Sequence, residues 1–198
     1  MRQPQQSYPY YRTDSHWRQE KLFPVADTLA AGMGFDLDHE SYTGEGFDRF
    51  YGVYYGQSAL NIKPDEMIWL VSDTTKNAVV NNMEKPGQRF PVYDLSQLDT
   101  VDPYSLFMCG PSAIVTARNP GNASGRKLIL FRDSFASALS PLLLDAYSEI
   151  TLIDLRYVQP DALGQMVDFT GQDVLFMYSA GLFNTSDSVR GVSEPPAS

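Results

Sequence analysis

Four short apolar runs in the second half of the chain constrain its fold more than any other feature. They occupy residues 113–116, 127–131, 150–154 and 174–178. Apolar runs of this length are typical of strands buried on both faces, as in a parallel sheet. Between them, residues 134–147 and 160–169 have the apolar spacing of helices. Strands that alternate with helices predict a three-layer α/β/α domain with a mostly parallel sheet.

The first half of the chain has weaker signals. Residues 14–33 have near-helical apolar spacing, with an interruption near Pro24. Residues 35–60 are rich in Gly, Asp and Tyr, which predicts loop and ribbon. Residues 67–71 and 78–80 are predicted to be strands, most simply joined as a hairpin.

Length and composition indicate one domain. A chain of 198 residues that is 43% hydrophobic can bury a core of ordinary size. We expect a single domain over residues 1–185, with a loop and β-ribbon insertion over residues 35–100. The composition after Asn184 predicts a disordered tail over residues 186–198.

Charge, hydropathy and cysteine content exclude several classes of protein. The 15 Lys and Arg against 24 Asp and Glu give a net charge of −9, which disfavours binding to nucleic acid or anionic lipid. No apolar run reaches the roughly 20 residues of a membrane-spanning helix, and the first residues lack the apolar stretch of a signal peptide. Chemistry-bearing residues within the first 16 positions suggest a piece of a longer or exported precursor. The lone cysteine, Cys109, excludes an internal disulfide and is expected to be buried.

Ser134 follows a predicted strand and begins a predicted helix. A serine at such a turn has its amide directed out of the helix N-terminus, where the helix dipole favours an oxyanion. Asp133 or Ser134 could equally be a plain helix cap, because both residue types are preferred there. A nucleophilic serine also requires an adjacent base.

One of the two histidines could be that base. His16 follows Asp14 by two residues, and side chains at this spacing share a face in an extended or turn conformation. Asp14 could then accept a hydrogen bond from one ring nitrogen of His16, which leaves the other free for the Ser134 proton. Alternatively, Thr13 or Asp14 caps a helix and His16 has no chemical role.

The second histidine, His39, lies in a polar segment and is predicted to be a solvated loop residue. Metal binding by Asp14 and His16, with His39 or Asp133 added, would have no recognised ligand spacing. We therefore predict neither a metal nor a cofactor.

Two stretches of the chain resemble the DHHW protein family. Residues 11–17, Tyr-Arg-Thr-Asp-Ser-His-Trp, resemble the Asp-His-His-Trp motif for which the family is named. Residues 128–144 and 150–157 are similar to its serine block and the strand that follows. These proteins are similar in turn to the bacterial AlgX- and AlgJ-like polysaccharide O-acetyltransferases, which have an SGNH-hydrolase-like domain. In that group the Asp-x-His pair precedes the serine, as it does in this chain.

The resemblance implies an SGNH-hydrolase-like, flavodoxin-like domain in which Ser134 is the nucleophile, His16 the general base and Asp14 its orienting acid. Ser15 stands where the family has its first His. Arg132 stands where many SGNH enzymes have Gly, so the turn lacks the conformational freedom of glycine there. Arg132 could instead approach an anionic group or pair with a carboxylate.

The oxyanion donors complete the predicted site. The Ser134 amide is one candidate, and a Gly and an Asn from other loops usually complete SGNH sites. Gly110 and Asn184 could serve as that pair. Gly110, beside Pro111, could equally be a plain turn, and Asn184 a loop residue.

Together these features predict a serine esterase or O-acetyltransferase acting on an acylated carbohydrate, such as a cell-surface polysaccharide or exopolysaccharide. The resemblance implies a location outside the cytoplasm, and no feature specifies an oligomeric state. The 12 Tyr, 11 Phe and 2 Trp are compatible with stacking on sugar faces. The alternative is a catalytically inactive binding or structural module with the same fold. A distance within roughly 3.5 Å between Ser134 Oγ and a His16 ring nitrogen would favour the enzyme.

Overall fold

The computed structural model describes residues 8–58 and 61–186. The strands are β1 (Thr43–Phe50), β2 (Asp65–Val71), β3 (Val79–Asn82), β4 (Ile114–Arg118), β5 (Lys127–Arg132), β6 (Glu149–Ile153) and β7 (Asp173–Met177). The α-helices are α1 (Phe23–Met33), α2 (Val53–Ser58), α3 (Asp73–Asn77), α4 (Ser134–Leu143), α5 (Leu163–Met166) and α6 (Ala180–Thr185). The 3-10 helices are η1 (Gln19–Lys21), η2 (His39–Ser41), η3 (Leu95–Asp99), η4 (Pro103–Leu106) and η5 (Pro160–Ala162).

The central element is a five-stranded sheet with the order β3-β4-β6-β5-β7. Strand β5 lies parallel to both β6 and β7, whereas β4 lies antiparallel to β6 and β3. The four predicted apolar runs are therefore confirmed as strands, but the mostly parallel sheet is corrected to a mixed one. An apolar run indicates that a strand is buried, but it does not indicate whether the strand is parallel or antiparallel to its neighbours.

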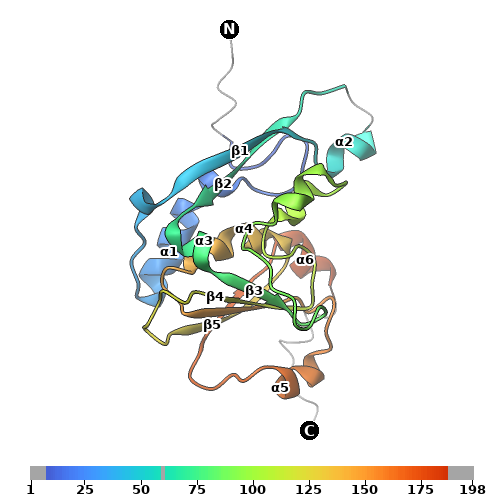
Figure 1. Ribbon diagram of the computed structural model, residues 1–198. Helices are drawn as coiled ribbons and strands as arrows, with labels where there is room; N and C mark the ends of the chain where they lie inside the picture. The colour runs from blue at the N-terminus through green and yellow to red at the C-terminus, as the bar shows by residue number, and fades with distance from the viewer. Residues whose placement is uncertain (1–7, 59–60, 187–198) are drawn as a thin grey trace.

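The two faces of this sheet contact different layers. On β5, Leu128 and Leu130 enter a large core, and Ile129 and Phe131 enter a smaller one. Figure 1 shows α1 and α4 above the sheet and the short α5 below it. A layer of long helices thus covers one face, whereas α5 and loops cover part of the other.

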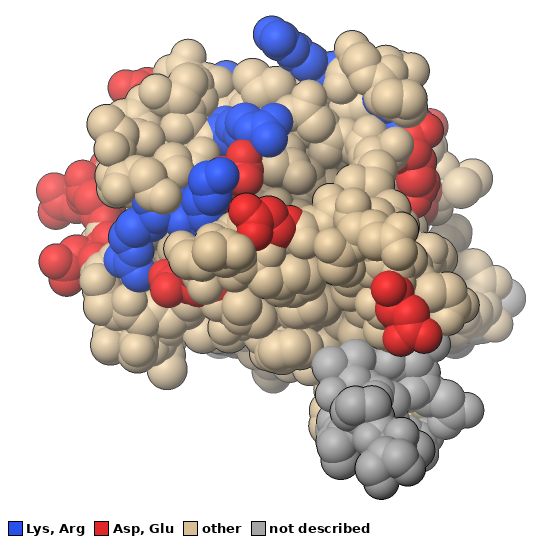
Figure 2. Space-filling model, turned by 90° about the horizontal axis from the view of Figure 1, so that it is seen from below, with Lys and Arg blue, Asp and Glu red and all other residues tan. Residues whose placement is uncertain are grey.

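The face that carries α5 is incompletely covered near its edge. Strand β7 is an edge strand, and its Val174 and Phe176 are 44% and 54% exposed. The prediction that this strand is buried on both faces is therefore wrong. Figure 2 views the molecule from the α5 side, where broad uncharged areas separate the charged groups.

A two-stranded antiparallel ribbon of β1 and β2 forms an additional layer above the helices (Figure 1). The ribbon predicted within residues 35–100 is present, but the predicted hairpin of residues 67–71 with 78–80 is wrong. Helix α3 lies between β2 and β3 in the chain and begins with a capping box of Ser72 and Thr75. Strand β3 consequently pairs with β4 in the other sheet.

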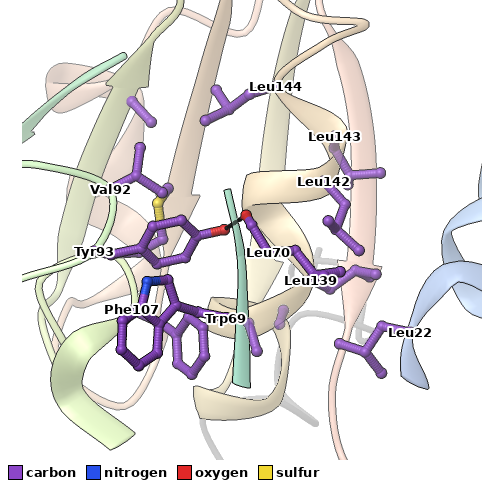
Figure 3. Packing of buried hydrophobic residues seen from close by; sticks show 14 of the residues in the cluster. Leu22, Trp69, Leu70, Val92, Tyr93, Phe107, Leu139, Leu142, Leu143 and Leu144 are labelled. Atoms are coloured by element: carbon purple, nitrogen blue, oxygen red, sulfur yellow. Dashed lines mark hydrogen bonds between the residues drawn. The ribbon is translucent and has the colours of Figure 1, made fainter. Parts of the chain in front are cut away.

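Buried polar side chains connect the ribbon to the core. The Tyr93 hydroxyl donates to the Leu70 carbonyl at 2.6 Å, as Figure 3 shows. The Gln19 side chain accepts from the Leu70 amide at 2.7 Å and donates to the Ala138 carbonyl of α4 at 2.7 Å. Gln19 therefore fixes the ribbon against α4.

The first helix is shorter than the sequence predicted. The helix expected from residue 14 begins at Phe23, and Pro24 lies in its first turn rather than interrupting it. The helix ends at Met33 and is capped by Gly34, whose φ of 73° is left-handed. Apart from Ser186, the predicted tail of residues 186–198 lies outside the described residues. None of the described helices is long and apolar enough to cross a membrane.

Candidate active site

Ser134 is the first residue of α4, directly after β5 and Asp133, so the predicted strand-to-helix turn is confirmed. We call residues 132–135 the serine turn. The Asp133 carboxylate accepts from the Phe135 amide at 3.0 Å and from the Ser179 amide at 2.7 Å. Asp133 is therefore the helix cap, which leaves the hydroxyl of half-buried Ser134 available to another partner.

That partner is His16, which lies in an irregular segment of residues 12–17 that we call the Asp-His turn. His16 Nε2 lies 2.7 Å from Ser134 Oγ, within the distance expected of a nucleophile and its base. His16 Nδ1 lies 2.5 Å from Asp14 Oδ1. The structure thus brings together three residues from two distant segments in a continuous hydrogen-bonded array.

The charge on Asp14 determines the direction of these hydrogen bonds. Burial acts to raise the pKa of the Asp14 carboxyl, but the hydrogen bonds and charge of His16 and the Val53 amide outweigh it and lower this pKa. An ionised carboxylate only accepts hydrogen bonds, so Nδ1 of His16 carries a proton and donates it. In this tautomer Nε2 carries no proton and is the acceptor for the Ser134 hydroxyl.

Aromatic side chains hold the imidazole ring in place. The His16 ring stacks on buried Tyr104 of η4, with centroids 4.0 Å apart and planes 12° apart. The Phe135 ring lies 5.1 Å from it, and Trp17 Nε1 donates to the Phe135 carbonyl at 2.7 Å. The side chain of His16 remains 15% exposed, so one edge of the array stays accessible to a substrate.

Asp65, at the start of β2, holds the Asp-His turn and was not identified from the sequence. It is 1% exposed, and its Oδ2 accepts from the Arg12 amide at 2.9 Å, the Thr13 amide at 2.8 Å and Thr13 Oγ1 at 2.8 Å. Its Oδ1 pairs with Arg12 Nε at 3.1 Å. One acid before a predicted strand forms no recognisable motif, so no local signal indicated this role.

The segment that begins α2 lies against the other side of Asp14. The Val53 amide donates to Asp14 Oδ2 at 2.9 Å, and the Tyr54 amide donates to the Thr13 carbonyl at 3.0 Å. A Cβ atom at Gly52 would lie 2.1 Å from Asp14 Cβ. Gly52 belongs to the segment of residues 35–60 that was predicted to be loop and ribbon, and its lack of a side chain permits this close approach.

The structure places Arg132 inside the protein, where it does not pair with a carboxylate of the described residues. Burial lowers the pKa of its guanidinium, and Asp154 partly opposes this effect. Arg132 donates to Ser137 Oγ at 3.0 Å and to the Gly110 carbonyl at 3.2 Å. Within residues 8–58 and 61–186 no carboxylate lies within 4.0 Å of it. Arg132 therefore ties the loop at Gly110 to the first turn of α4.

The loop at Gly110 has an unusual backbone. Met108, Cys109 and Gly110 all have left-handed φ values, of 51°, 63° and 63°. The Gly110 amide donates to the Phe107 carbonyl at 3.0 Å, so it is already engaged and would have to be released to bind an oxyanion. Cys109 is half-buried, and burial raises the pKa of its thiol to about 11.

The remaining candidate, Asn184, is an exposed residue of α6. The contact between the start of α6 and the serine turn is made by Ser179, so an oxyanion role for Asn184 stays a prediction. His39 is part of η2, and its Nε2 pairs with Asp27 at 2.7 Å rather than with a residue of the array. Among the described residues, no group of three or more His, Cys, Asp or Glu could hold a metal ion.

The fold and this array define an α/β protein with a hydrogen-bonded serine, histidine and aspartate. The model of the DHHW protein family matches residues 1–153, and the chain belongs to this family. No match was found among curated proteins.

Solved structures share the fold. A DHHW family protein from Eubacterium siraeum is 23% identical, with a TM-score of 0.73 over 94% of this chain and 63% of that one. Bacillus cereus PatB1 is 18% identical, with a TM-score of 0.69 over 91% of this chain and 65% of PatB1. PatB1 with a sulfonyl adduct is 17% identical, with a TM-score of 0.67 over 92% and 63%. The chain therefore spans less than two thirds of the length of these structures.

Proposed function

We propose that the chain is a serine-dependent acyl-ester enzyme, an esterase or O-acetyltransferase acting on an acylated carbohydrate. The observation that carries this proposal is the 2.7 Å contact between Ser134 Oγ and His16 Nε2, with His16 Nδ1 on buried Asp14. Such an array is the arrangement by which a weakly nucleophilic hydroxyl is activated.

In the proposed reaction, Ser134 Oγ attacks the ester carbonyl and its proton moves to His16 Nε2. Asp14 stabilises the resulting imidazolium through the hydrogen bond to Nδ1. When the tetrahedral intermediate collapses, His16 gives the proton to the leaving alcohol and Ser134 retains the acyl group. Water or a sugar hydroxyl then attacks the acyl-enzyme and gives its proton to His16. The bond between the acyl group and Ser134 Oγ breaks, His16 returns the proton to Ser134, and the acceptor distinguishes hydrolysis from transfer.

The N-terminus of α4 is suited to bind the oxyanion. Ser134 is the first residue of this ten-residue helix, so its amide has no partner within the helix. The Asp133 carboxylate is occupied by the Phe135 and Ser179 amides. We propose the Ser134 amide as one oxyanion donor, with Asn184 and, after release from Phe107, Gly110 as candidates for the others.

The finer assignments rest on resemblance. We propose an SGNH-hydrolase-like domain, a carbohydrate ester substrate and a location outside the cytoplasm. The reason is that residues 11–17 and the serine block of residues 128–144 resemble the motifs of proteins with these properties. The fold similarity to PatB1, which is known with a sulfonyl adduct, supports a nucleophilic site of this kind.

Hydrolysis of p-nitrophenyl acetate tests the proposal. The wild type should hydrolyse this ester, and Ser134→Ala and His16→Ala should each lower kcat by roughly a thousandfold or more. His39→Ala is the matched control, since its imidazole pairs with Asp27 outside the array. Equal rates for the wild type and Ser134→Ala would reject Ser134 as the nucleophile and favour the inactive binding module.

A second measurement distinguishes the two reactions. Acetyl transfer to added oligosaccharides, measured by mass spectrometry, should exceed hydrolysis if the enzyme is a transferase. Hydrolysis that is unchanged by every acceptor would identify an esterase.

A further inference from the structure

We propose that three exposed tyrosines next to the Asp-His turn form a binding platform for an uncharged sugar chain. They are Tyr51, Tyr54 and Tyr55. We call them the tyrosine cluster. This inference rests on the proposed function and names the part of the site that would hold the carbohydrate.

The tyrosine cluster is exposed although its rings are large. Tyr51, Tyr54 and Tyr55 are 37%, 45% and 39% exposed, and Val53 between them is 47% exposed. The rings of Tyr51 and Tyr55 contact each other with centroids 4.3 Å apart and planes 40° apart. The rings of Tyr51 and Tyr55 thus form a joined area of exposed aromatic surface, which commonly marks a binding site.

Two hydrogen bonds from backbone amides connect the segment of the tyrosine cluster to the Asp-His turn. Val53 donates its amide to Asp14 Oδ2 at 2.9 Å, and Tyr54 donates its amide to the Thr13 carbonyl at 3.0 Å. Gly52, between Tyr51 and Val53, lies directly against Asp14. Figure 1 shows α2 at one end of the ribbon, away from the five-stranded sheet. The tyrosine cluster therefore belongs to the segment that lies against Asp14 and Thr13.

The chemistry of the segment fits a neutral saccharide. Residues 51–57, Tyr-Gly-Val-Tyr-Tyr-Gly-Gln, carry no charged side chain. The preceding charged residue, Arg49, lies 3.9 Å from Asp99. A tyrosine offers an apolar ring face for the C–H groups of a sugar and a hydroxyl for its oxygens, at a small cost in side-chain entropy. A strongly charged ligand would find no complementary charge in this segment.

Direct binding to β-linked hexasaccharides of glucose, xylose and N-acetylglucosamine tests the platform without turnover. Isothermal titration calorimetry of the wild type should show binding to at least one of them. Tyr51→Ala combined with Tyr55→Ala should weaken that binding about tenfold or more, because both rings that would stack on the sugar are lost. Tyr51→Phe combined with Tyr55→Phe, which keeps the rings, should retain most of the affinity.

The matched control is Tyr157→Ala, because Tyr157 is 53% exposed and lies after β6, outside the tyrosine cluster. It should bind like the wild type, and thermal unfolding should show that all variants are folded. Saccharide binding that is equal in the wild type and the double alanine variant would overturn the inference, as would a wild type that binds none of the three. Both results are independent of ester hydrolysis, so they are distinguishable from failure of the proposed function.

Discussion

The serine turn and the Asp-His turn contribute to one site but are held in different ways. Ser134 lies between a buried strand and a ten-residue helix, so regular backbone hydrogen bonds position it on both sides. His16 lies in an irregular segment. The Asp65 side chain of the ribbon and the backbone amides of Val53 and Tyr54 at the start of α2 position this segment.

This difference predicts where the site is vulnerable. A turn within regular structure loses little when one side chain is removed, because the neighbouring strand and helix remain. A turn held by one buried carboxylate loses several hydrogen bonds at once when that carboxylate is removed. Substitutions around the Asp-His turn should therefore impair activity more than comparable ones around the serine turn.

Among the residues that support Ser134 and His16, Asp14 should matter most, so Asp14→Asn should have the largest effect on activity. An amide can hydrogen-bond the wrong tautomer of His16 and does not stabilise the imidazolium, so kcat on p-nitrophenyl acetate should fall on the order of 10³–10⁴-fold. Asp27→Asn, at the acid that pairs with His39, is the control and should keep wild-type kcat. A fall of only a few-fold for Asp14→Asn would show that the Asp-His turn is not part of the reacting array.

Asp65→Ala should come next, because it removes the acceptor of Arg12 Nε and of the three donors that share Asp65 Oδ2. We expect kcat to fall about a hundredfold and the free energy of unfolding to fall by about 2–4 kcal/mol. Asp65→Asn can keep an oxygen opposite those donors and lose only the ion pair with half-exposed Arg12, so it should be much milder. Equal losses in the two variants would mean that the ion pair, rather than the carboxylate's support of the turn, matters.

Asp133→Ala tests the serine turn in the same way and should have a smaller effect on kcat. It removes the cap of α4 and the hydrogen bond from the Ser179 amide. The free energy of unfolding should therefore fall by about 1–2 kcal/mol, and kcat should fall about threefold to tenfold. Ser72→Ala removes the cap of α3 and should cost similar stability without a change in kcat. A loss of kcat as large as that of Asp65→Ala would contradict the contrast between the turns.

The pH dependence of stability should show the smallest effect. The Asp14 pKa is lowered in the folded protein from its ordinary value of 3.8. Its contribution to stability is therefore complete above that value and is lost as the pH falls through the lower folded pKa. Urea unfolding from about pH 6 to about pH 3 should show a steeper loss of stability for the wild type than for Asp14→Asn. Parallel curves would mean that Asp14 is not stabilised as a carboxylate.

The same contrast explains what could be predicted from the sequence. Strand β5, the serine turn and α4 are adjacent in the chain and have clear apolar periodicity, so their order and the place of Ser134 were predicted correctly. The Asp14 and His16 pair was found because the two residues are neighbours in the sequence. The support from Asp65, Gly52 and Gln19 depends on contacts between distant segments, which have no local signal.

Strand pairing could not be predicted for a related reason. Residues 67–71 and 78–80 are close in sequence, which favoured a hairpin, but the capping box at Ser72 and Thr75 starts a helix between them. Apolar content also did not reveal that β4 is antiparallel or that β7 is an edge strand. Both properties depend on which strands become neighbours in the sheet.

The central claim is that Ser134 is a nucleophile activated by His16. Phenylmethylsulfonyl fluoride reacts with activated serines, and peptide mass spectrometry locates the sulfonyl group that it leaves. We predict one adduct on the peptide that contains Ser134 in the wild type and in His39→Ala, a much slower reaction in His16→Ala, and none at that peptide in Ser134→Ala. Labelling of Ser134 at the same rate with and without His16, or no labelling of Ser134 in the wild type, would contradict the account.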